Sequence, residues 1–393
     1  MKFLRNFHWT FWKVVAALLM LAGLVAAVDR YAFGLGATTN LKDSFPWGIW
    51  IGVDILVGVG LAAGGFSIAA TVYLFNLERF RPILRPTILT AFLGYVLVIC
   101  GLMVDLGRPW AIWHAMIMWN PHSVMFEVAW CVMLYTTVLA LEFSPVVLEK
   151  FKLHAALKVM KTITIPLVVL GVVLSTLHQS SLGSLFLIIP GRMHPLWYSN
   201  VIPFLFFISC VAAGLAMTIF ESFLSSRSFG REVELPLLAD LARALVVVLA
   251  LFFTIRIQDL TTRNALGYAF DGSYQSWMFL LEIVLGVIVP FFLLLMPKIR
   301  TSKSGLFYSA VLVLLGFVAN RMNTAITSME HWPSRTYLPS WQELSITLGL
   351  AAAGFVTFTV IAKSFKVFGE HPHSAVDDSD AHEEFPLRAV ASK

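Results

Sequence analysis

The chain has 393 residues, of which 58% are hydrophobic and only 13% charged, and its mean hydropathy is +0.80. This composition excludes an ordinary soluble domain and is typical of a polytopic membrane protein. The formal net charge of +5 does not indicate nucleic-acid binding, because the basic residues lie in short loops between apolar runs.

Apolar runs long enough to cross a bilayer occur ten times, so we expect an all-α integral membrane protein with ten transmembrane helices. The first run is too long for a signal peptide and lacks a small-x-small cleavage site. We expect one membrane domain over residues 1–368 and a disordered tail over 369–393, because the tail is polar and aperiodic. The expected spans are 13–31, 47–75, 87–105, 123–143, 162–178, 200–221, 237–256, 276–296, 306–324 and 343–365.

Lysine and arginine residues divide unevenly between alternate loops. With a cytoplasmic N-terminus, 20 of the 28 lie on the inner side and 8 on the outer side. This excess on one side predicts that both termini are cytoplasmic. The eight expected outside are Arg30, Lys42, Arg108, Arg192, Arg256, Arg263, Arg321 and Arg335.

A faint internal repeat relates the two halves of the chain. The fourth span opens with the segment 123–127 and the eighth with the similar segment 276–282, and each segment ends in glutamate. We interpret spans 2–5 and 6–9 as two four-helix bundles of the same orientation, flanked by spans 1 and 10.

The second span contains the most informative stretch of the chain. Trp47, Trp50 and Asp54 are spaced by three and four residues and therefore share one face of an α-helix. A carboxylate at the depth of Asp54 costs about 3 kcal/mol to insert, so it should face protein, water or a ligand. The Gly60-x-x-x-Gly64 pair should let a neighbouring helix approach closely.

Other ionisable residues are expected at a similar depth near the outer face. Asp105 ends the third span, Glu127 lies one turn into the fourth, and His178 ends the fifth. Within one bundle these side chains and Asp54 could converge. The structural alternative is that each acid pairs with an arginine or caps a helix, and Asp105 with Arg108 is the obvious pair.

Two further acids, Glu282 and Glu142, are less strongly indicated as functional residues. Glu282 in the eighth span lies near arginines expected outside, which could neutralise it. Glu142 lies near the cytoplasmic end of the fourth span and is either interfacial or the inner end of a proton path.

Histidine and cysteine positions bear on cofactors. A haem held between helices usually needs paired intramembrane histidines, and only His178 lies at a span, so we expect no haem. The three cysteines stand singly in apolar runs, so we expect no iron–sulfur cluster, zinc site or disulfide. We expect no metal site in this chain.

An aromatic, acid-lined pocket without a cofactor motif fits a membrane quinone. The ring can stack on tryptophan, and its carbonyls can accept hydrogen bonds from His178 or Gln179. Reduction consumes two protons, which buried carboxylates and histidine can relay. Ten helices and buried acids would also suit a secondary transporter, and a passive anchor for other proteins would explain the helices alone.

Several motifs resemble the NrfD/polysulfide-reductase membrane-subunit family, in particular the membrane subunits of nickel–iron hydrogenases. The resemblance covers nearly the whole chain. The motifs are Phe33-Gly34-x-Gly36, Phe45-Pro46-Trp47-Gly48-x-Trp50 with Asp54, Gly64-Gly65, Asp105-x-Gly107-Arg108, Asn120-Pro-His-Ser123 with Phe126-Glu127, Leu177-His178-Gln179-Ser180-Ser181, His194-Pro195-x-Trp197 and Pro339-x-Trp341-x-Glu343.

The resemblance implies a multi-pass protein of the bacterial inner membrane in anaerobic respiration. It implies periplasmic partners: hydrogenase large and small subunits and a ferredoxin-like multi-cluster iron–sulfur subunit. Electrons from hydrogen would reach menaquinone or ubiquinone bound near the outer face, and Glu127 would match a glutamate that moves protons. A membrane subunit of another periplasmic redox enzyme is the alternative within the family.

Two sets of candidate site residues follow from these arguments. Those expected to bind the quinone are Trp47, Trp50, Asp54, Arg108, His178 and Gln179. Those expected to transfer protons are Glu127, Asp105, Glu142 and Glu282.

Overall fold

The structure is a computed structural model of the chain and describes residues 10–43, 45, 47–330 and 336–368. Within these residues the regular structure is helical, apart from one isolated bridge between Lys42 and Phe45. Ten helical stretches of the described chain are long and apolar enough to cross a membrane, by length and composition. The prediction of an all-α protein with ten spans is therefore confirmed. The tail 369–393, which we expected to be disordered, lies outside the described residues.

Most spans are longer than the apolar runs that predicted them, whereas the second, expected over 47–75, is Trp50–Tyr73. The fifth, expected over 162–178, is the helix α8 (His154–Ser184), and the sixth, expected over 200–221, is α9 (Ile202–Phe229). Their ends carry polar residues, because backbone hydrogen bonding continues beyond the apolar run. The other spans are α1 (Phe11–Phe33), η1–α3–α4 (Trp50–Val57, Gly58–Leu61, Gly64–Tyr73), α5 (Arg81–Asp105), α7 (Val124–Lys150), α10 (Leu235–Thr262), α11–η7–α12 (Tyr274–Ile283, Val284–Ile288, Val289–Leu295), α14–η8 (Lys303–Met322, Asn323–Thr327) and α15 (Trp341–Ser364).

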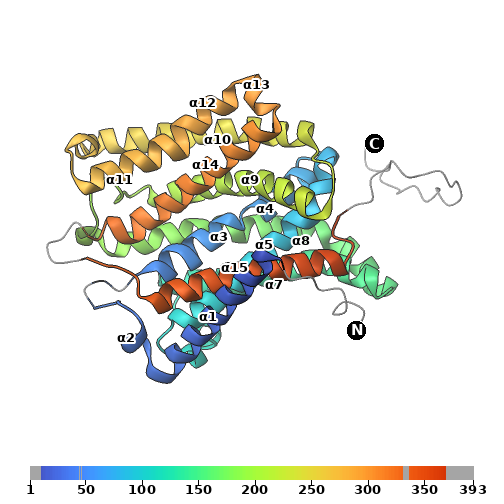
Figure 1. The fold of residues 1–393 in the computed structure, drawn as a ribbon, viewed down its shortest axis with the longest axis horizontal. Coiled ribbons are helices and arrows are strands. Elements are labelled where there is room, and N and C mark those ends of the chain that lie inside the picture. Colours follow the sequence, from blue (N-terminus) through green and yellow to red (C-terminus); the bar gives the residue numbers. More distant parts are fainter. Residues whose placement is uncertain (1–9, 44, 46, 331–335, 369–393) are drawn as a thin grey trace, which may run out of the picture.

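Short helices lie in the connections between spans. They are α2 (Leu35–Thr38), α6 (His114–Ile117), the 3₁₀ turn η4 (Leu185–Ile188) that follows α8, and α13 (Pro297–Arg300). In Figure 1, α2 lies at one end of the bundle and α13 at the other.

The long helices form two groups of four that share a wall. In the first group α4 contacts α5, α5 contacts α7, α7 contacts α8, and α8 contacts α4. In the second group α9 contacts α10, α10 contacts α12, α12 contacts α14, and α14 contacts α9. These contacts are compatible with the two-bundle interpretation, which stays a prediction.

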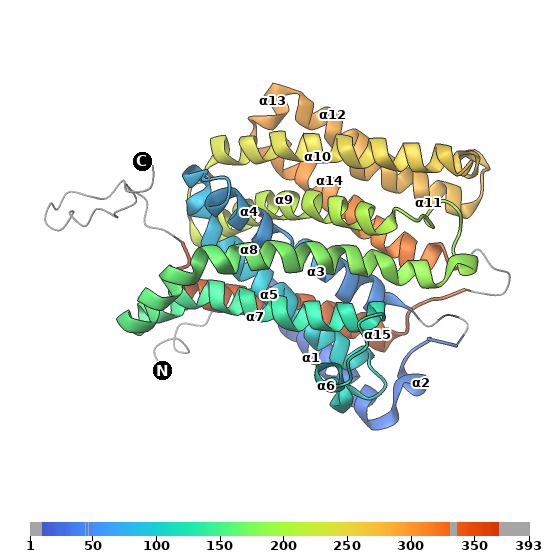
Figure 2. The ribbon, with the colours of Figure 1, turned by 180° about the vertical axis from the view of Figure 1, so that it is seen from behind.

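The remaining long helices, α1 and α15, pack against each other and lie beside the first group, where α15 contacts α5. Figure 1 shows them at the front, and Figure 2 shows α7 and α8 in front when the molecule is seen from behind. The contact between α8 and α9 joins the two groups. The first span and the last span in the chain are thus neighbours in space.

Three segments inside the spans are π-helical: η1, η7 and η8. Their turns are wider than α-helical turns, and such segments are frequent at functional sites. Two of them, η1 and η8, contact each other. Because η1 begins at Trp50, the α-helical spacing that placed Trp47 on one face with Trp50 and Asp54 does not hold there.

Glycines let helices meet backbone to backbone. A Cβ added to Gly286 would lie 2.4 Å from Cα of Gly316, and one added to Gly316 would lie 2.0 Å from Cα of Gly286. The expected close contact of the second span is present too, since a Cβ on Gly64 would lie 3.0 Å from the carbonyl oxygen of Gly214 in α9. A Cβ on Gly60 would meet the ring of Phe317 in α14 at 2.1 Å.

The contact between Gly286 and Gly316 yields a stability prediction. Replacing Gly316 by Ala should destabilise the protein by about 1–3 kcal/mol, because the added methyl group forces two backbones apart. The matched control is Gly267→Ala, since a Cβ there would have no heavy atom within 4 Å. Thermal unfolding in one detergent should show a lower midpoint for the first variant only. Equal midpoints would mean that the helix pair is not tightly packed.

Candidate functional site

A buried histidine and tyrosine meet inside the first group of helices. His178 of α8 and Tyr95 of α5 are both 0% exposed, and Tyr95 Oη lies 2.9 Å from His178 Nδ1. Tyr135 of α7 is also fully buried, and its ring packs edge-on against that of Tyr95 with centroids 4.7 Å apart. Three different spans therefore bring polar aromatic side chains to one place.

Several buried polar atoms in this place have no hydrogen-bond partner among the described residues. They are Tyr135 Oη, Ser175 Oγ, His178 Nε2 and Gln179 Oε1. The amide nitrogen of Gln179 donates to the carbonyl oxygen of Val59, at 3.2 Å. Buried polar groups are costly to leave unpaired, and ordered water satisfies them where the site is polar. The arrangement suits a line of water and side chains that can pass protons.

Glu142 extends this polar line along α7. A Cβ added to Gly171 of α8 would lie 3.5 Å from Glu142 Oε1 and 3.6 Å from the ring of Tyr135. Glu142 and Tyr135 thus border the same point of α8. The structure brings together His178, Gln179 and Glu142, but Glu127 lies partly exposed in the first turn of α7, where its charge suits the helix dipole.

Asp54 lies on another side of the second span. Its Oδ2 accepts a hydrogen bond from Thr347 Oγ1 of α15 at 2.9 Å, and a Cβ on Gly101 of α5 would lie 3.0 Å from its Cβ. Trp50 is 1% exposed, and its Nε1 donates to the carbonyl oxygen of Glu343 in α15 at 3.2 Å. Trp50 and Asp54 therefore face α15, whereas Gln179 of α8 bonds to the same span at Val59.

Trp47 precedes the π-helical segment and packs elsewhere. Its ring meets Phe186 of η4 edge-on, with centroids 5.3 Å apart. Phe186 follows directly on the helix that carries His178. Five of the six expected quinone-binding residues are thus divided between the α15 side and the α8 side of the second span, and the sixth, Arg108, is exposed.

The expected pairing of Asp105 with Arg108 is wrong. Arg108 is exposed, and the positive charge that acts on Asp105 is that of Arg30 in α1. The Arg30 guanidinium donates to the carbonyl oxygens of Val104 at 2.8 Å and Leu106 at 2.6 Å. It caps the end of α5, where carbonyl groups lack helical partners. Proximity in sequence favoured Arg108, but α1 brings a buried arginine closer.

A glutamate at the start of α15 ties the connections on this end together. Glu343 is 0% exposed and forms a capping box with Ser340. Tyr337 Oη donates to Glu343 Oε1 at 2.5 Å and accepts from the backbone N–H of Ile49 at 3.0 Å. Burial, and then the hydrogen bond to Glu343, raise the pKa of Tyr337 above its usual value, so it remains a donor. This cluster fixes the chain just before Trp50.

Glu282 is enclosed by donors in the second group. It accepts from Trp197 Nε1 at 3.0 Å, from Asn320 Nδ2 at 2.6 Å and from Asn323 Nδ2 at 2.9 Å. A buried acid with three donors is well satisfied. Arg256 and Arg321, which we placed among the outer arginines, also act electrostatically on Glu282, so the alternative that arginines neutralise this acid is compatible with the structure.

Two arginines that we assigned to outer loops are buried in helices instead. Arg256 lies in α10 and is 3% exposed, and Arg321 lies in α14 and is 1% exposed. Arg321 donates to Asn320 Oδ1 at 2.6 Å and to Ser209 Oγ at 2.9 Å, and it stacks on Phe206. The spans extend past the apolar runs, so these residues are within the packed protein.

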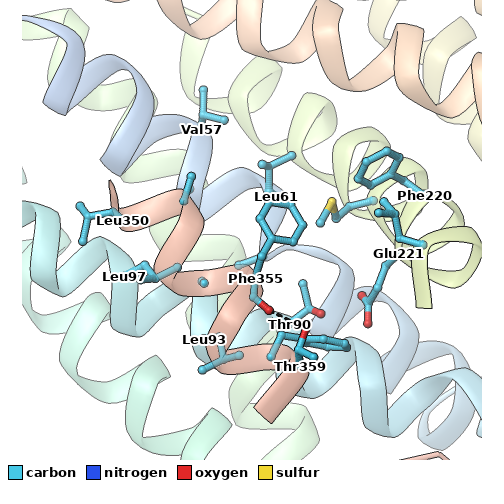
Figure 3. A pocket seen from close by; sticks show the side chains of 18 of the residues that line it. Val57, Leu61, Thr90, Leu93, Leu97, Phe220, Glu221, Leu350, Phe355 and Thr359 are labelled. Carbon is cyan, nitrogen blue, oxygen red and sulfur yellow. Dashed lines mark hydrogen bonds between the residues drawn. The ribbon is translucent and has the colours of Figure 1, made fainter. Parts of the chain in front are cut away.

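A cavity of about 310 Å³ lies between the second span, α5, α9 and α15. Leu61, Leu97 and Phe355 contribute to its apolar wall, and Asp54 and Thr347 also line it (Figure 3). Glu221 of α9 lines it as well, is 9% exposed and has no hydrogen-bond partner for either carboxylate oxygen among the described residues.

Sequence reasoning missed several of these residues. On α8, Ser175 lies three residues before His178 and four before Gln179, so these side chains share one helix face. On α7, Tyr135 and Glu142 are seven residues apart and also share a face. This spacing could have indicated the row of buried polar side chains between the two helices. Tyr95 and Glu221 are isolated in apolar runs, and only the packing of neighbouring helices shows where they point. The missed residues are Tyr95, Tyr135, Ser175, Glu221, Thr347 and Arg30.

Known proteins are similar to this chain over nearly its whole length. A protein of Nitratidesulfovibrio vulgaris is 39% identical over 382 residues, which cover 94% of this chain and 96% of that protein. The "Probable Ni/Fe-hydrogenase 2 b-type cytochrome subunit" of Escherichia coli K12 is 32% identical, covering 94% and 96%. The "Menaquinone reductase, integral membrane subunit" of N. vulgaris is 29% identical, covering 88% of each.

The name of the E. coli relative corrects one expectation. A b-type cytochrome subunit is one that binds haem, so the prediction of a chain without haem is contradicted. The prediction counted pairs of histidines, but methionine, cysteine and tyrosine also serve as axial ligands of haem iron, and such sites escape that count. In the structure, His178 has a buried Nε2 without a protein partner, which fits one axial ligand.

The family comparison covers most of the spans described above. Residues 37–329 match the family described as "Polysulphide reductase, NrfD", a range that extends from the connection before the second span to the end of the ninth. The E. coli relative is 32% identical over an alignment that covers 94% of the chain. Together with the family match, this similarity shows that the chain belongs to the NrfD family.

Proposed function

We propose that this chain is the quinone-reactive membrane subunit of a periplasm-facing respiratory hydrogenase complex. Electrons from hydrogen pass through iron–sulfur clusters of partner subunits to menaquinone or ubiquinone bound in this chain. The partners are a nickel–iron hydrogenase large subunit, its small subunit and a ferredoxin-like multi-cluster subunit. The names of the E. coli and N. vulgaris relatives, a hydrogenase subunit and a menaquinone reductase subunit, support this assignment.

The observation that carries the proposal is the pair of His178 and Tyr95. When the tyrosine hydroxyl donates to Nδ1, the neutral imidazole carries its proton on Nε2, which then has no acceptor among the described residues. A donor held in this way can hand a proton to water or to a quinone oxygen. Reduction of one quinone takes up two electrons and two protons, so a proton route must accompany the electron route.

The quinone ring is assigned to the outer end of the second span. Trp50 and Asp54 face this end from the α15 side, and Trp47 packs beside η4. Gln179 of α8 contacts the same span further along, at Val59. Arg108 is an exposed cation after α5. A ring bound there lies next to the surface on which iron–sulfur partners would dock.

Protons are assigned to the polar line of the first group. Glu142, Tyr135, Tyr95 and His178 extend from the middle of α7 towards the end of α8, with unpartnered atoms that water can bridge. Glu127 and Asp105 are assigned to proton exchange near the outer face. Glu282 is a poorer candidate, because three donors hold its carboxylate oxygens and give it a structural role.

The haem that the E. coli relative's name implies would carry single electrons between a donor and the quinone. His178 is the buried described residue with a nitrogen free to hold its iron. Iron held at Nε2 would take the place of the Nε2 proton, so the haem-ligand role and the proton-donor role of His178 are alternatives.

Replacing His178 by Ala should abolish hydrogen-dependent quinone reduction in the purified complex, because the buried proton donor is lost. Tyr95→Phe should reduce the rate less, since the imidazole remains but loses its orienting hydroxyl. Reduction of a soluble dye by the hydrogenase subunits should stay unchanged in both variants. His154→Ala, at the exposed start of α8, is the control. Normal quinone reduction in His178→Ala would remove the residue from the site.

Replacing Glu127 by Gln keeps its shape and removes its titration. Turnover with quinone and the associated proton uptake should fall while the complex still assembles. Drawing protons from the cytoplasm would move charge across the membrane, worth about 2.3 kcal/mol per charge per 100 mV. Proton uptake can be measured in liposomes containing the complex, with the exposed Glu232→Gln as the matched control. Full activity with unchanged proton uptake would leave Glu127 as a structural acid.

A further inference from the structure

The cavity next to Asp54 is a slot that runs along the helices. Each helix lines it with one face: α15 contributes Thr347, Leu350, Ala351, Gly354, Phe355, Phe358 and Thr359. The spacing of three, one, three, one, three and one is that of a single helix face. Twelve residues of α15 correspond to roughly 18 Å at 1.5 Å per residue. On α9 the lining residues extend from Met217 to Phe229, an equal length.

The slot is narrow for its length and its walls are mostly apolar. Its volume of about 310 Å³ extends along the lining residues of α15, from Thr347 to Thr359, and of α9, from Met217 to Phe229. Figure 3 shows Leu97 and Leu350 on one side of the slot, Leu61 and Phe355 in its middle, and Phe220 on the opposite side. A linear hydrocarbon chain matches this shape, whereas a compact polar solute does not.

The charges of the slot favour one kind of chain over another. Asp54 lies at one end with Thr347, and Glu221 lines the other part. Two acids disfavour a phosphate headgroup within the slot, because like charges in a partly buried site repel strongly. A quinone ring carries no charge, so the two acids do not repel it.

We propose that this slot holds the isoprenoid tail of the membrane quinone, with the ring at the Asp54 and Thr347 end. The proposal rests on the proposed function and adds to it a substrate class: quinones with a long tail. The tail runs from Asp54 between α5 and α15 towards Phe229. Tail binding places the ring at the same end as Trp50.

Glu221 and Thr90 are polar residues in the otherwise apolar wall, in the part of the slot away from Asp54. Glu221 points towards Thr90 in Figure 3, and the side-chain oxygens of both residues lack hydrogen-bond partners among the described residues.

The experiment narrows the slot without touching the ring site. Ala351→Phe and Leu224→Trp add bulk at two places along it, on α15 and on α9. Val356→Phe is the matched control, because Val356 is an exposed residue of α15 that does not line the slot. The purified complex with its partner subunits is assayed for hydrogen-dependent reduction of two naphthoquinones, one with a long isoprenoid tail and one without a tail.

Both slot variants should raise the KM for the tailed naphthoquinone by about tenfold or more, the loss of roughly 1.4 kcal/mol of tail binding. The KM for the tail-less compound and the dye reduction rate should stay unchanged. The control variant should match the unmodified complex with both naphthoquinones. Mass spectrometry of the purified complex should also show less co-purified quinone in the slot variants.

Different results would refute the quinone function and the binding of the tail in the slot. Reduction of neither naphthoquinone by the unmodified complex would refute the quinone function itself. Reduction of both, with equal KM values in slot variants and control, would refute the tail slot alone. Loss of a co-purified phospholipid from the slot variants, with unchanged quinone kinetics, would assign the slot to an acyl chain and also overturn the proposal. If Ala351→Phe does not assemble, Leu224→Trp supplies the same test.

Discussion

Close contact between helix backbones is the constraint on which the rest of this structure depends. Lipid offers no hydrophobic driving force for helix association, so packing must come from shape. Gly286 and Gly316 join α11–η7–α12 to α14, and Gly64 and Gly214 join the two groups of helices. Contacts this short hold the side chains between the helices in place. The polar line, the Glu282 cluster and the slot all lie between helices positioned in this way.

Both groups of helices contain buried polar networks and buried polar atoms without hydrogen-bond partners among the described residues. In the second group, Glu282 accepts three hydrogen bonds, and Arg321 donates to a side-chain amide and a hydroxyl, but Arg256 Nε and Ser309 Oγ lack partners. In the first group, Tyr135, Ser175 and His178 retain such atoms. Satisfied networks rigidify a fold, whereas unpaired buried groups need water or a ligand. Under the proposed function, the unpaired atoms of the first group are those that water bridges to pass protons.

The second span separates two environments. Its Asp54 faces α5, α15 and the slot, while the carbonyl oxygen of Val59 accepts from Gln179 on the α8 side. The π-helical turn between Trp50 and Val57 rotates the residues before it relative to those after it. Under the proposed function, the quinone approaches from the α15 side and the protons from the α8 side, so one helix borders both routes.

The sequence by itself determined the class of the protein and the ten spans, and it predicted which isolated polar residues are candidates for a site. Runs of apolar residues and the cost of a buried charge are local properties, and they sufficed to single out Asp54, His178 and Glu142. Tertiary structure decided which of these residues meet. Tyr95 comes to His178, Arg30 to Asp105, and Thr347 to Asp54 only because helices distant in sequence pack side by side. The direction in which a side chain of a mostly apolar helix points depends on its neighbours, since lipid-facing and protein-facing surfaces are similarly apolar.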